Sequence, residues 1–375
     1  MSHSSEQARA VSPDVLSMLS PLQAMLPSHL QALAETMEQQ WLFAGETLFT
    51  GGQFDTRVYY LLYGTVEYRH GSGEVETVEA YQTLTPLGDE QPRPYTLVAI
   101  ADCSVISFDR DYLDKLLTWS QTAEYLLADI SMNMDLDEDT HWMNTILRSN
   151  LFLKVPPTNM GRLFKDIRSE LVYKGDVIIR QGEYGECCYF IKEGAAEVTR
   201  RNEALGSWEH VADIGPGRCF GEDALVQQTV RNANVTMTSD GVLMLLEKGR
   251  FLELLREDRV PSLHWTQWQQ QRHQFIVIDV RTGQEYSRQH LQDAINIPLN
   301  LLSLKRRILP ADKSFLVYCD SGRRSRAATK LLNEAGVSAL YLKHGANAIP
   351  RESYHELVTI QDYVIRDGQV IASVS

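Results

Sequence analysis

The sequence is short of cysteine, of long apolar runs and of net positive charge, and each shortage excludes a class of protein. Five cysteines scattered over 375 residues, an odd number, do not make a disulfide framework. No apolar run approaches the roughly 20 residues that span a bilayer. The first residues are polar, without the apolar core of a signal peptide. A net charge of −13 disfavours binding to a phosphate backbone. We therefore expect a soluble, cytoplasmic protein that binds neither membrane nor nucleic acid.

A long internal repeat organises the first two thirds of the chain. The hydrophobic fraction of 43% is ordinary, and 375 residues favour several domains. Three blocks recur at one constant offset: residues 44–49 with 174–179, 52–55 with 182–185, and 60–67 with 190–197. Blocks in register over such a distance indicate a duplicated domain and not a solenoid, whose period would be shorter. Short apolar runs broken by glycine turns predict an all-β barrel or sandwich in each copy. Helical patterns at 28–39 and 251–255 flank the copies.

Three aspartates between the copies, Asp135, Asp137 and Asp139, have the spacing of a calcium loop. Thr140 stands where that loop needs glycine, and Ile146 stands where it needs a bidentate glutamate. A solvated linker or helix surface is favoured, and we expect no metal site.

The pattern changes after about residue 258. A helix is predicted over 265–272, with Trp265 and Trp268 on one face as core contacts. Apolar runs too short for helices then alternate with helical stretches such as 325–334; the runs are 275–278, 315–318 and 339–342. Continuous apolar strands alternating with helices are typical of a parallel sheet buried on both faces. The C-terminal domain is therefore predicted to be α/β.

Residues 220–235 of the second copy have the features of an anion site. Gly221 allows close backbone approach, and a short helical turn over 222–225 would aim free N–H groups at an anion. Arg231 can add a bidentate contact to phosphate, and Glu222 can accept a hydrogen bond from a sugar hydroxyl. A surface turn with a solvated arginine is the alternative.

The same residues resemble the phosphate-binding cassette of the cyclic nucleotide-binding domain family. The matching positions are Phe220, Gly221, Glu222, Ala224, Leu225, Thr229, Arg231 and Ala233. The resemblance implies a β-roll fold (a double-stranded β-helix) and a cyclic nucleotide as regulatory ligand. It also implies that Glu222 holds the ribose 2′-hydroxyl, that Arg231 pairs with the cyclic phosphate and that backbone at Gly221 and Ala224 completes the cradle. Leu225 and Asn232 belong to the expected site. Val230 replaces a frequent proline, and Asn232 stands where small or hydroxyl residues are common; cAMP is favoured over cGMP because the threonine often linked with cGMP is absent.

The first copy resembles the same family in its strands but lacks most of the cassette. Residues 87–89 align with 220–222, and residues 101–102 align with 239–240, so five residues are missing between these anchors. Arg93 lies between two prolines, which cannot continue a helix. We expect the first copy to be ligand-incompetent, with a structural role or a role in dimer contact.

Cys319 follows a predicted buried strand and opens a predicted helix. That position gathers backbone N–H groups and the positive end of a helix around one sulfur. Arg323 and Arg324 add positive potential, so we expect a lowered thiol pKa and a nucleophilic thiolate. Ser325 is predicted as the N-cap residue and Gly336 as the stop. The alternative is an inert core cysteine.

The loop is one residue short of a cysteine phosphatase cradle, because Ser325 stands where that arginine is needed. Residues 279–286, 290–291 and 294–298, together with the cysteine loop, resemble the rhodanese (sulfurtransferase) family over roughly 262–350. The resemblance implies that Cys319 becomes a persulfide and passes sulfur on, a covalent two-step catalysis without a cofactor. One departure is 344–349, where many members carry Gly-Gly and a tryptophan.

The resemblance also implies the roles of the loop residues. Backbone N–H groups of Asp320, Ser321, Gly322, Arg323, Arg324 and Ser325 would stabilise the persulfide anion. The two arginines would attract an anionic donor such as thiosulfate, with a thiol or cyanide-like acceptor. Asp279 and Arg281 would hold the loop by hydrogen bonds.

The other cysteines carry weaker expectations. Cys187 and Cys188 lie in a predicted strand and point to opposite faces, so one of them fills the core. Cys103 is expected in the core, and Cys219 beside the cassette is a weak candidate for oxidation. The tail 351–375 is predicted to contain a hairpin and has no assigned function.

The predicted architecture is multidomain: two β-rolls with flanking helices, then an α/β parallel-sheet rhodanese domain. The expected boundaries are 1–135, 136–258, 259–350 and a C-terminal extension over 351–375. The favoured function is a sulfurtransferase that responds to a cyclic nucleotide bound in the second copy, as a possible homodimer. The alternative is a non-catalytic sensor or adaptor.

Overall fold

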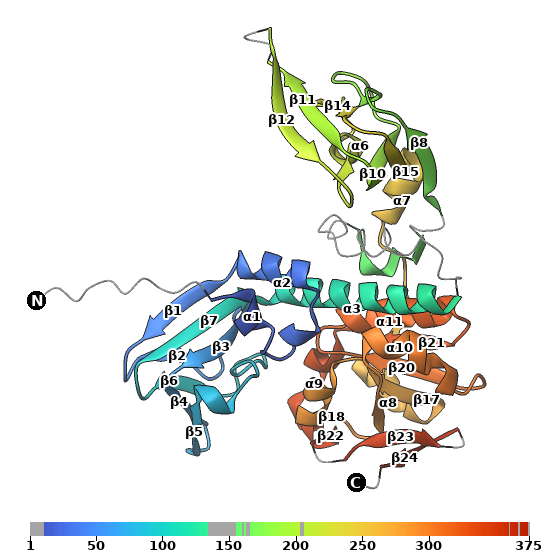
Figure 1. Ribbon diagram of the computed structural model, residues 1–375. Helices are drawn as coiled ribbons and strands as arrows, with labels where there is room; N and C mark the ends of the chain where they lie inside the picture. Colours follow the sequence, from blue (N-terminus) through green and yellow to red (C-terminus); the bar gives the residue numbers. More distant parts are fainter. Residues whose placement is uncertain are drawn as a thin grey trace, which may run out of the picture. The chain divides into compact units, whose positions relative to one another are not determined.

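The computed structural model describes residues 11–133, 155–159, 161–162, 166–202, 206–359, 361–366 and 368–373. The chain forms two compact units. One combines the chain up to Thr122 with the chain from Val260 onward, and the other runs from Ala123 to Arg259. The first repeat and the C-terminal domain thus share a unit (Figure 1). The aspartates of the calcium-like spacing lie outside the described residues. Over the described ranges, no helix is both long enough and apolar enough to cross a bilayer.

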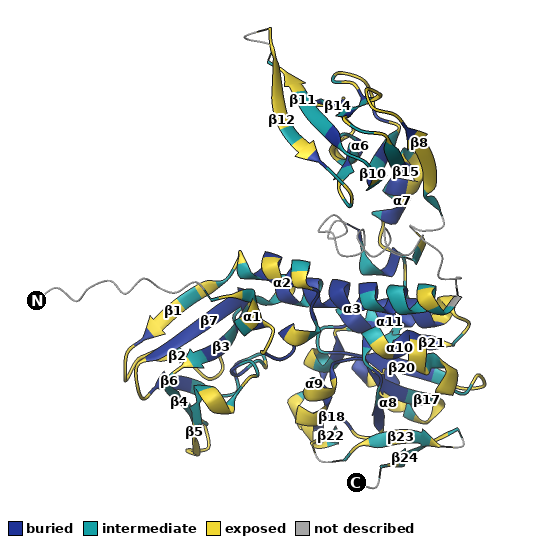
Figure 2. Ribbon diagram, in the orientation of Figure 1, coloured by how far each residue is buried: buried dark blue, intermediate teal, exposed yellow. Residues whose placement is uncertain are grey.

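The first repeat packs two antiparallel sheets face to face, in the orders β1-β7-β3 and β2-β6-β4-β5. Its strands are β1 (Glu38–Leu42), β2 (Thr47–Phe49), β3 (Arg57–Tyr63), β4 (Thr65–Arg69), β5 (Val75–Glu79), β6 (Thr96–Ala99) and β7 (Cys103–Asp109). Side chains such as Leu61, Val66 and Val105 fill the space between the sheets. Figure 2 shows β7 buried along its length, as expected for a strand with a neighbour on each side.

Three helices flank the first repeat: α1 (Pro13–Leu16), α2 (Pro27–Ala34) and α3 (Arg110–Asn133). The prediction of a helix over 28–39 is wrong at its end. Glu38 and Gln39 belong to β1, because they pair with Ser107 and Ile106 of β7. Sheet pairing overrides the local helical pattern there.

The second unit repeats this architecture, with sheets in the orders β13-β10-β15-β8 and β12-β11-β14-β9. The strands are β8 (Arg168–Val172), β9 (Val177–Ile179), β10 (Cys187–Glu193), β11 (Ala196–Arg201), β12 (Trp208–Ile214), β13 (Cys219–Phe220), β14 (Asn234–Met237) and β15 (Gly241–Glu247). Helix α6 (Glu222–Gln227) follows β13, and α7 (Lys248–Leu254) closes the roll. The predicted pair of β-rolls is confirmed.

The C-terminal domain contains a five-stranded sheet in the order β16-β21-β20-β17-β19, with every pair parallel. Its strands are β16 (Ser262–Leu263), β17 (Phe275–Asp279), β19 (Ala294–Asn296), β20 (Ser314–Tyr318) and β21 (Ala339–Leu342). The helices are α8 (Trp265–Gln270), α9 (Gly283–Arg288), α10 (Leu302–Lys305) and α11 (Arg323–Glu334). The predicted α/β domain is confirmed, and both tryptophans of α8 are buried in its core. The sheet places the carboxyl end of its central strand, β20, at the loop that carries Cys319.

Two short pairings complete this domain. Strand β18 (His290–Leu291) pairs with β22 (Leu357–Val358), and the C-terminal strands β23 (Tyr363–Arg366) and β24 (Gln369–Ala372) form the predicted hairpin. The imidazole Nε2 of His290 lies 2.7 Å from the carbonyl oxygen of Gln361. The tail is therefore attached to the domain through a buried histidine.

Candidate functional site

The loop between β20 and α11 holds Cys319 at the end of the buried central strand. Helix α11 begins at Arg323, with Gly322 as its N-cap residue. Gly322 has a φ of 94°, and a Cβ at this position would lie 3.1 Å from the His344 amide nitrogen. Only glycine adopts this turn without strain. The prediction of Ser325 as N-cap is wrong, because the helix begins before it, whereas Gly336 follows the helix with the expected positive φ.

The sulfur of Cys319 accepts hydrogen bonds from the loop backbone. The Gly322 N–H donates to Sγ at 3.2 Å and the Ser325 N–H at 3.5 Å, while Ser325 Oγ lies 3.6 Å away. The Arg323 N–H turns to the Ser321 hydroxyl instead, at 3.1 Å. Two of the expected backbone groups thus form a cradle for a sulfur anion.

Residues 344–347 support the cysteine loop from behind. The Ala346 N–H donates to the Cys319 carbonyl at 2.8 Å, and the Asn347 N–H donates to the Asp320 carbonyl at 3.0 Å. A Cβ at Gly345 would lie 2.1 Å from the Cys319 carbonyl oxygen. This segment, which departs from the family pattern, contacts the loop through its backbone, while Ala346 also packs against the core of the domain.

The pKa of the Cys319 thiol is raised above its usual value, against the prediction from the sequence. Burial is the largest cause. The charge of Arg324 and the Ser325 N–H act to lower the pKa, while the charges of Asp114 and Asp320 raise it. The prediction is wrong because it counted the arginines and the helix end but not the complete burial of the thiol.

Alkylation of Cys319 is therefore expected to accelerate by about tenfold per pH unit through pH 8 and to keep rising beyond pH 9. A raised pKa moves the thiolate population to higher pH. The rate is read by mass spectrometry of the Cys319 peptide after timed exposure to iodoacetamide. The same peptide in the urea-unfolded chain is the reference, and a plateau below pH 8 in the folded protein would contradict the prediction.

Arg324 is buried among carboxylates. Its guanidinium donates to both oxygens of Glu285 at 2.8 Å and to Asp320 Oδ2 at 3.0 Å. Glu285 also accepts from the Thr282 N–H and hydroxyl at the start of α9, at 2.9 and 2.8 Å. Burial raises the pKa of Asp320 to about 6 in spite of its arginine partners. The sequence analysis missed Glu285, although Thr-x-x-Glu is a capping-box spacing that marks a helix start.

Arg281 connects the end of β17 to the cysteine loop. It donates to Asp279 at 2.7 and 3.1 Å, to Asp320 Oδ1 at 2.9 Å and to the Gln289 carbonyl at 2.6 Å. Asp279 and Arg281 are both buried. Their arrangement fits the supporting role expected for them.

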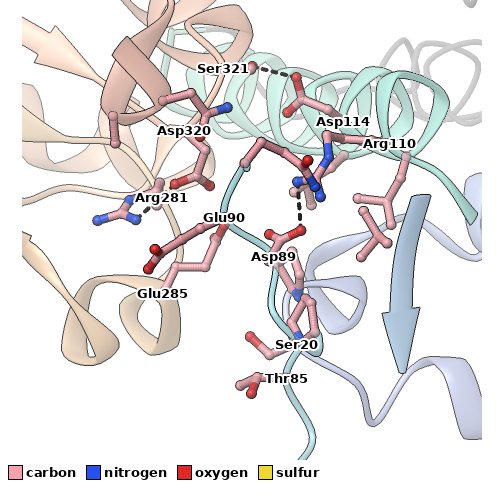
Figure 3. A pocket seen from close by; sticks show the side chains of 18 of the residues that line it. Ser20, Thr85, Asp89, Glu90, Arg110, Asp114, Arg281, Glu285, Asp320 and Ser321 are labelled. Atoms are coloured by element: carbon pink, nitrogen blue, oxygen red, sulfur yellow. Dashed lines mark hydrogen bonds and ion pairs between the residues drawn. The ribbon is translucent and has the colours of Figure 1, made fainter. Parts of the chain in front are cut away.

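Arg323 also has carboxylate partners, and they come from the first β-roll. Its Nε lies 3.2 Å from Asp114 Oδ2, and its terminal nitrogen pairs with Asp111; both aspartates belong to α3. A cavity of about 340 Å³ lies beside this contact, lined by eight carboxylates and four arginines (Figure 3). Both arginines that were expected to attract an anionic donor are therefore in ion pairs.

In the second roll, Arg231 lies in the predicted cassette. Its guanidinium donates to the Gly221 carbonyl and, at 2.5 Å, to the Cys187 carbonyl. A Cβ at Gly185 would lie 2.5 Å from the Arg231 Cζ, and a Cβ at Gly221 would lie 2.6 Å from its Nη1. Two glycines thus leave a backbone-lined cradle around one buried guanidinium, which fits a phosphate group.

The other cassette residues lie on or next to the short helix α6. Leu225 is fully buried and anchors α6 to the roll. Glu222 is in the first turn and Ala224 in the middle, both half-buried, while Asn232 is exposed. Gly221 and Glu222 are adjacent at the start of α6, whereas Asn232 lies beyond the end of the helix.

The first roll contains an arginine equivalent to Arg231. The Arg93 N–H donates to the Gln53 carbonyl at 2.8 Å, as the Arg231 N–H donates to the Glu183 carbonyl at 2.8 Å. The Arg93 guanidinium likewise donates to the carbonyl of Gly88, at 2.6 Å. The signal for this match in the sequence is the distance to the next strand, because β6 and β14 each begin three residues after the arginine.

The surroundings of Arg93 differ from those of Arg231. Asp55 stands at the position of Gly185 and accepts from Arg93 Nε at 3.0 Å. Burial acts to raise the pKa of Asp55, but the hydrogen bonds from Arg93 and the Arg57 N–H keep it below its usual value. Tyr95 stands at the position of Ala233 and stacks on Tyr68, with ring centroids 4.1 Å apart. The guanidinium is neutralised from within the protein.

A cavity of about 400 Å³ remains on this side of the first roll, between Tyr68, Gly88 and Tyr95. Three carboxylates and the exposed Arg288 line it, and Arg93 does not. An anion in this cavity would meet mostly negative charge.

Two of the four remaining cysteines are core residues. Cys103 and Cys188 are buried, and Cys187 points to the other face of β10. Cys219 lies 3.8 Å from the Glu222 carboxylate, and burial raises its thiol pKa, which disfavours oxidation. Within the described part of the chain, no group of three or more His, Cys, Asp or Glu side chains is arranged so that it could hold a metal ion.

Comparison with known proteins agrees with both motifs. The model of the cyclic nucleotide-binding domain matches residues 39–118 and 170–258, and that of the rhodanese-like domain matches 262–351. cGMP-dependent protein kinase 2 of Mus musculus is 22% identical over 227 residues, which are 60% of this chain and 28% of the kinase. The cAMP-dependent protein kinase regulatory subunit of Yarrowia lipolytica is 26% identical over 234 residues, 60% of this chain and 56% of that one. The chain thus spans less than two thirds of either relative.

Solved structures give two further similarities. The regulatory domain of Toxoplasma gondii PKA with cAMP is 19% identical and covers 65% of this chain and 90% of its own, with a TM-score of 0.26. The Thermus thermophilus catabolite activator protein is 28% identical and covers 29% and 50%, with a TM-score of 0.26. The chain carries two cyclic nucleotide-binding domains followed by a C-terminal rhodanese-like domain.

Proposed function

We propose that the protein is a sulfurtransferase whose activity responds to a cyclic nucleotide bound in the second roll. The observation that carries the enzymatic part is the cradle around Cys319, where two backbone N–H groups point at Sγ from 3.2 and 3.5 Å. A cradle of this kind stabilises negative charge on sulfur, which is what a persulfide intermediate needs.

The reaction has two displacement steps through Cys319. The thiol loses its proton and attacks the outer sulfur of a donor such as thiosulfate. The sulfur–sulfur bond of the donor breaks, sulfite leaves with the electron pair, and a Cys319 persulfide forms. A thiol or cyanide acceptor then attacks the terminal sulfur and releases the Cys319 thiolate. The Gly322 and Ser325 N–H groups hold the sulfur anion in both steps.

The regulatory part rests on the cassette of the second roll. Arg231 and the backbone at Gly221 would hold the cyclic phosphate, and Glu222 would accept the ribose hydroxyl. The curated relatives named above are kinases or kinase subunits that their names connect with cGMP or cAMP. We favour cAMP, because Asn232 stands where a threonine is often linked with cGMP.

The first roll has a structural role in this proposal. Its Arg93 is neutralised by Asp55, and its α3 contacts the sulfur loop, so it serves the rhodanese-like domain instead of binding a nucleotide. A cytoplasmic homodimer is part of the same proposal.

A non-catalytic sensor or adaptor is the second candidate. The observation that favours it is the state of Cys319, which is fully buried and has a raised pKa. A thiol in this state reacts slowly until the loop is opened.

Thiocyanate release from thiosulfate and cyanide separates these candidates. The full chain is measured with and without saturating cAMP, next to Cys319→Ser. Release that is lost in the variant and changed by cAMP is the expected result. Thiocyanate release that is the same with and without cAMP would reject the nucleotide response. Release by the wild type equal to that of Cys319→Ser would reject the enzyme and favour the adaptor.

A further inference from the structure

The first two turns of helix α3 contact Ser321 and Arg323 of the sulfur loop, which joins β20 to α11. The Ser321 hydroxyl donates to Asp114 Oδ2 at 2.5 Å, and Arg323 Nε donates to the same oxygen at 3.2 Å. Asp111, one turn earlier, pairs with Arg323. Figure 3 shows Asp114 and Ser321 pointing toward each other across the two domains. A carboxylate from the helix that flanks the first β-roll therefore accepts the hydrogen bonds that Ser321 and Arg323 can donate.

Asp114 is not needed to form α3. The N-cap residue of this helix is Asp109, whose carboxylate accepts the Tyr112 N–H at 2.9 Å. The carboxylate of Asp114 instead accepts from Ser321 and Arg323, and its side chain is only 15% exposed. The hydrogen bonds of the Asp114 carboxylate are therefore made with the rhodanese-like domain.

The groups that Asp114 occupies suit an anion. Arg323 and the Ser321 hydroxyl stand at the positive N-terminal end of the twelve-residue helix α11. Arg324 is already paired inside its own domain with Glu285 and Asp320. Arg323 is thus the loop arginine whose carboxylate partners come from outside the domain.

We propose that Asp114, assisted by Asp111, is a built-in inhibitor of the sulfur loop. Its carboxylate takes the place of an anionic sulfur donor at Ser321 and Arg323, and the donor must displace the turns of α3 that carry Asp111 and Asp114. This inference rests on the proposed sulfurtransferase function and adds the regulation of the same site. The complete burial of Cys319 agrees with a closed loop. Asp114 also adds to the rise in the thiol pKa that burial causes.

The length of α3 connects this contact with the second roll. The helix is continuous from Arg110 to Asn133, whereas the boundary between the two compact units lies after Thr122. The helix that carries Asp114 thus runs on into the chain segment of the other unit, and the cAMP arm of the test asks whether a nucleotide bound in the second roll changes the contact.

The contact is tested by the reactivity of Cys319 in the full chain. Wild type, Asp114→Asn and the double variant Asp111→Asn/Asp114→Asn are treated with neutral iodoacetamide and with anionic iodoacetate, and the Cys319 peptide is followed by mass spectrometry. Asp312→Asn is the matched control, because this exposed residue precedes β20 at the end opposite to Cys319.

Alkylation of Cys319 is expected to rise about tenfold in Asp114→Asn, the effect of removing a like charge near a thiolate. It should rise further with iodoacetate than with iodoacetamide, because Arg323 is released. Saturating cAMP should accelerate the wild type and leave the variant unchanged. Equal rates in wild type and both variants, or the same gain in Asp312→Asn, would overturn the proposal.

Alkylation needs no sulfur transfer, so the two proposals fail separately. Faster alkylation of Cys319 in Asp114→Asn, with no thiocyanate release by either the wild type or this variant, supports the inhibitory contact and rejects the enzyme. Thiocyanate release by the wild type with unchanged alkylation in both variants supports the enzyme and rejects the contact.

Discussion

Gly185→Asp is expected to weaken cyclic nucleotide binding by at least about 100-fold, which corresponds to roughly 3 kcal/mol. A Cβ at Gly185 would lie 2.5 Å from the Arg231 Cζ, so the new carboxylate meets the guanidinium directly. An internal ion pair would then compete with the cyclic phosphate for the same charge. Isothermal titration of the full chain with cAMP measures the loss.

The first roll already shows what this substitution does. Asp55 stands at the position of Gly185, and its carboxylate lies 3.0 Å from Arg93 Nε. Arg93 is fully buried and in the same backbone setting as Arg231. Gly185→Asp would give Arg231 the internal carboxylate partner that Arg93 already has.

Gly185→Asn is the control with the same size and no charge. It should lose less affinity than Gly185→Asp, and the difference between the two variants measures the charge alone. Equal losses would mean that crowding of Arg231 is sufficient. Unchanged affinity in Gly185→Asp would show that Arg231 does not carry the phosphate.

Contiguous motifs were predictable from the sequence. The cassette around Gly221 and the loop after Cys319 each lie within a few residues, where spacing alone restricts the chemistry. The alternation of strands and helices after residue 258 likewise predicted the parallel sheet that presents the loop. These parts of the site depend on local order, and local order is what a sequence shows directly.

Long-range neighbours were not predictable. Asp114 lies far from Ser321 in the chain, and only the packing of two domains brings them together. The two prolines beside Arg93 hide its equivalence to Arg231. The strand that follows Arg93, β6, nevertheless pairs with β2 as β14 pairs with β9 after Arg231. The Cys319 pKa was expected to fall because burial, its largest determinant, is a property of the whole fold.

Two anion sites of this chain are satisfied by its own carboxylates. Asp55 neutralises Arg93 within the first roll, and Asp114 of the same roll occupies Ser321 and Arg323 of the rhodanese-like domain. The two cases differ in burial. Arg93 is fully buried, whereas Arg323 is 37% exposed, so its partners can exchange with a ligand at far lower cost. In the proposal made above, the buried first pair therefore stays formed, whereas the more exposed second pair is suited to a reversible switch.

Glu285→Gln is expected to destabilise the rhodanese-like domain by about 3 kcal/mol, because it removes one partner of a buried ion pair. Arg324 is 2% exposed and Glu285 11%, and the two side chains share two hydrogen bonds of 2.8 Å. Hydrogen exchange at β20 and α11 measures the loss within this domain. Asp312→Asn is the control: Asp312 pairs with Lys313 at 3.8 Å, and both side chains are exposed, so such a pair contributes at most about 1 kcal/mol.

The pH dependence of stability gives the second signature of this variant. Burial acts to raise the pKa of Glu285, but the charge and hydrogen bonds of Arg324 outweigh it and hold the pKa well below its usual value. A lowered folded-state pKa contributes stability that is present above about pH 4.5 and is lost as the pH falls. Asp320, raised to about 6, acts with the opposite sign: its contribution is present below about pH 4 and is lost as the pH rises through 6. As the pH falls from about 5 to about 3, wild type should therefore lose protection of β20 and α11 relative to Glu285→Gln at the same pH, because the variant lacks the contribution of Glu285 while Asp320 acts in both proteins. A constant difference between the two proteins over this range would assign the titration to another carboxylate and leave Arg324 without a specific need for Glu285.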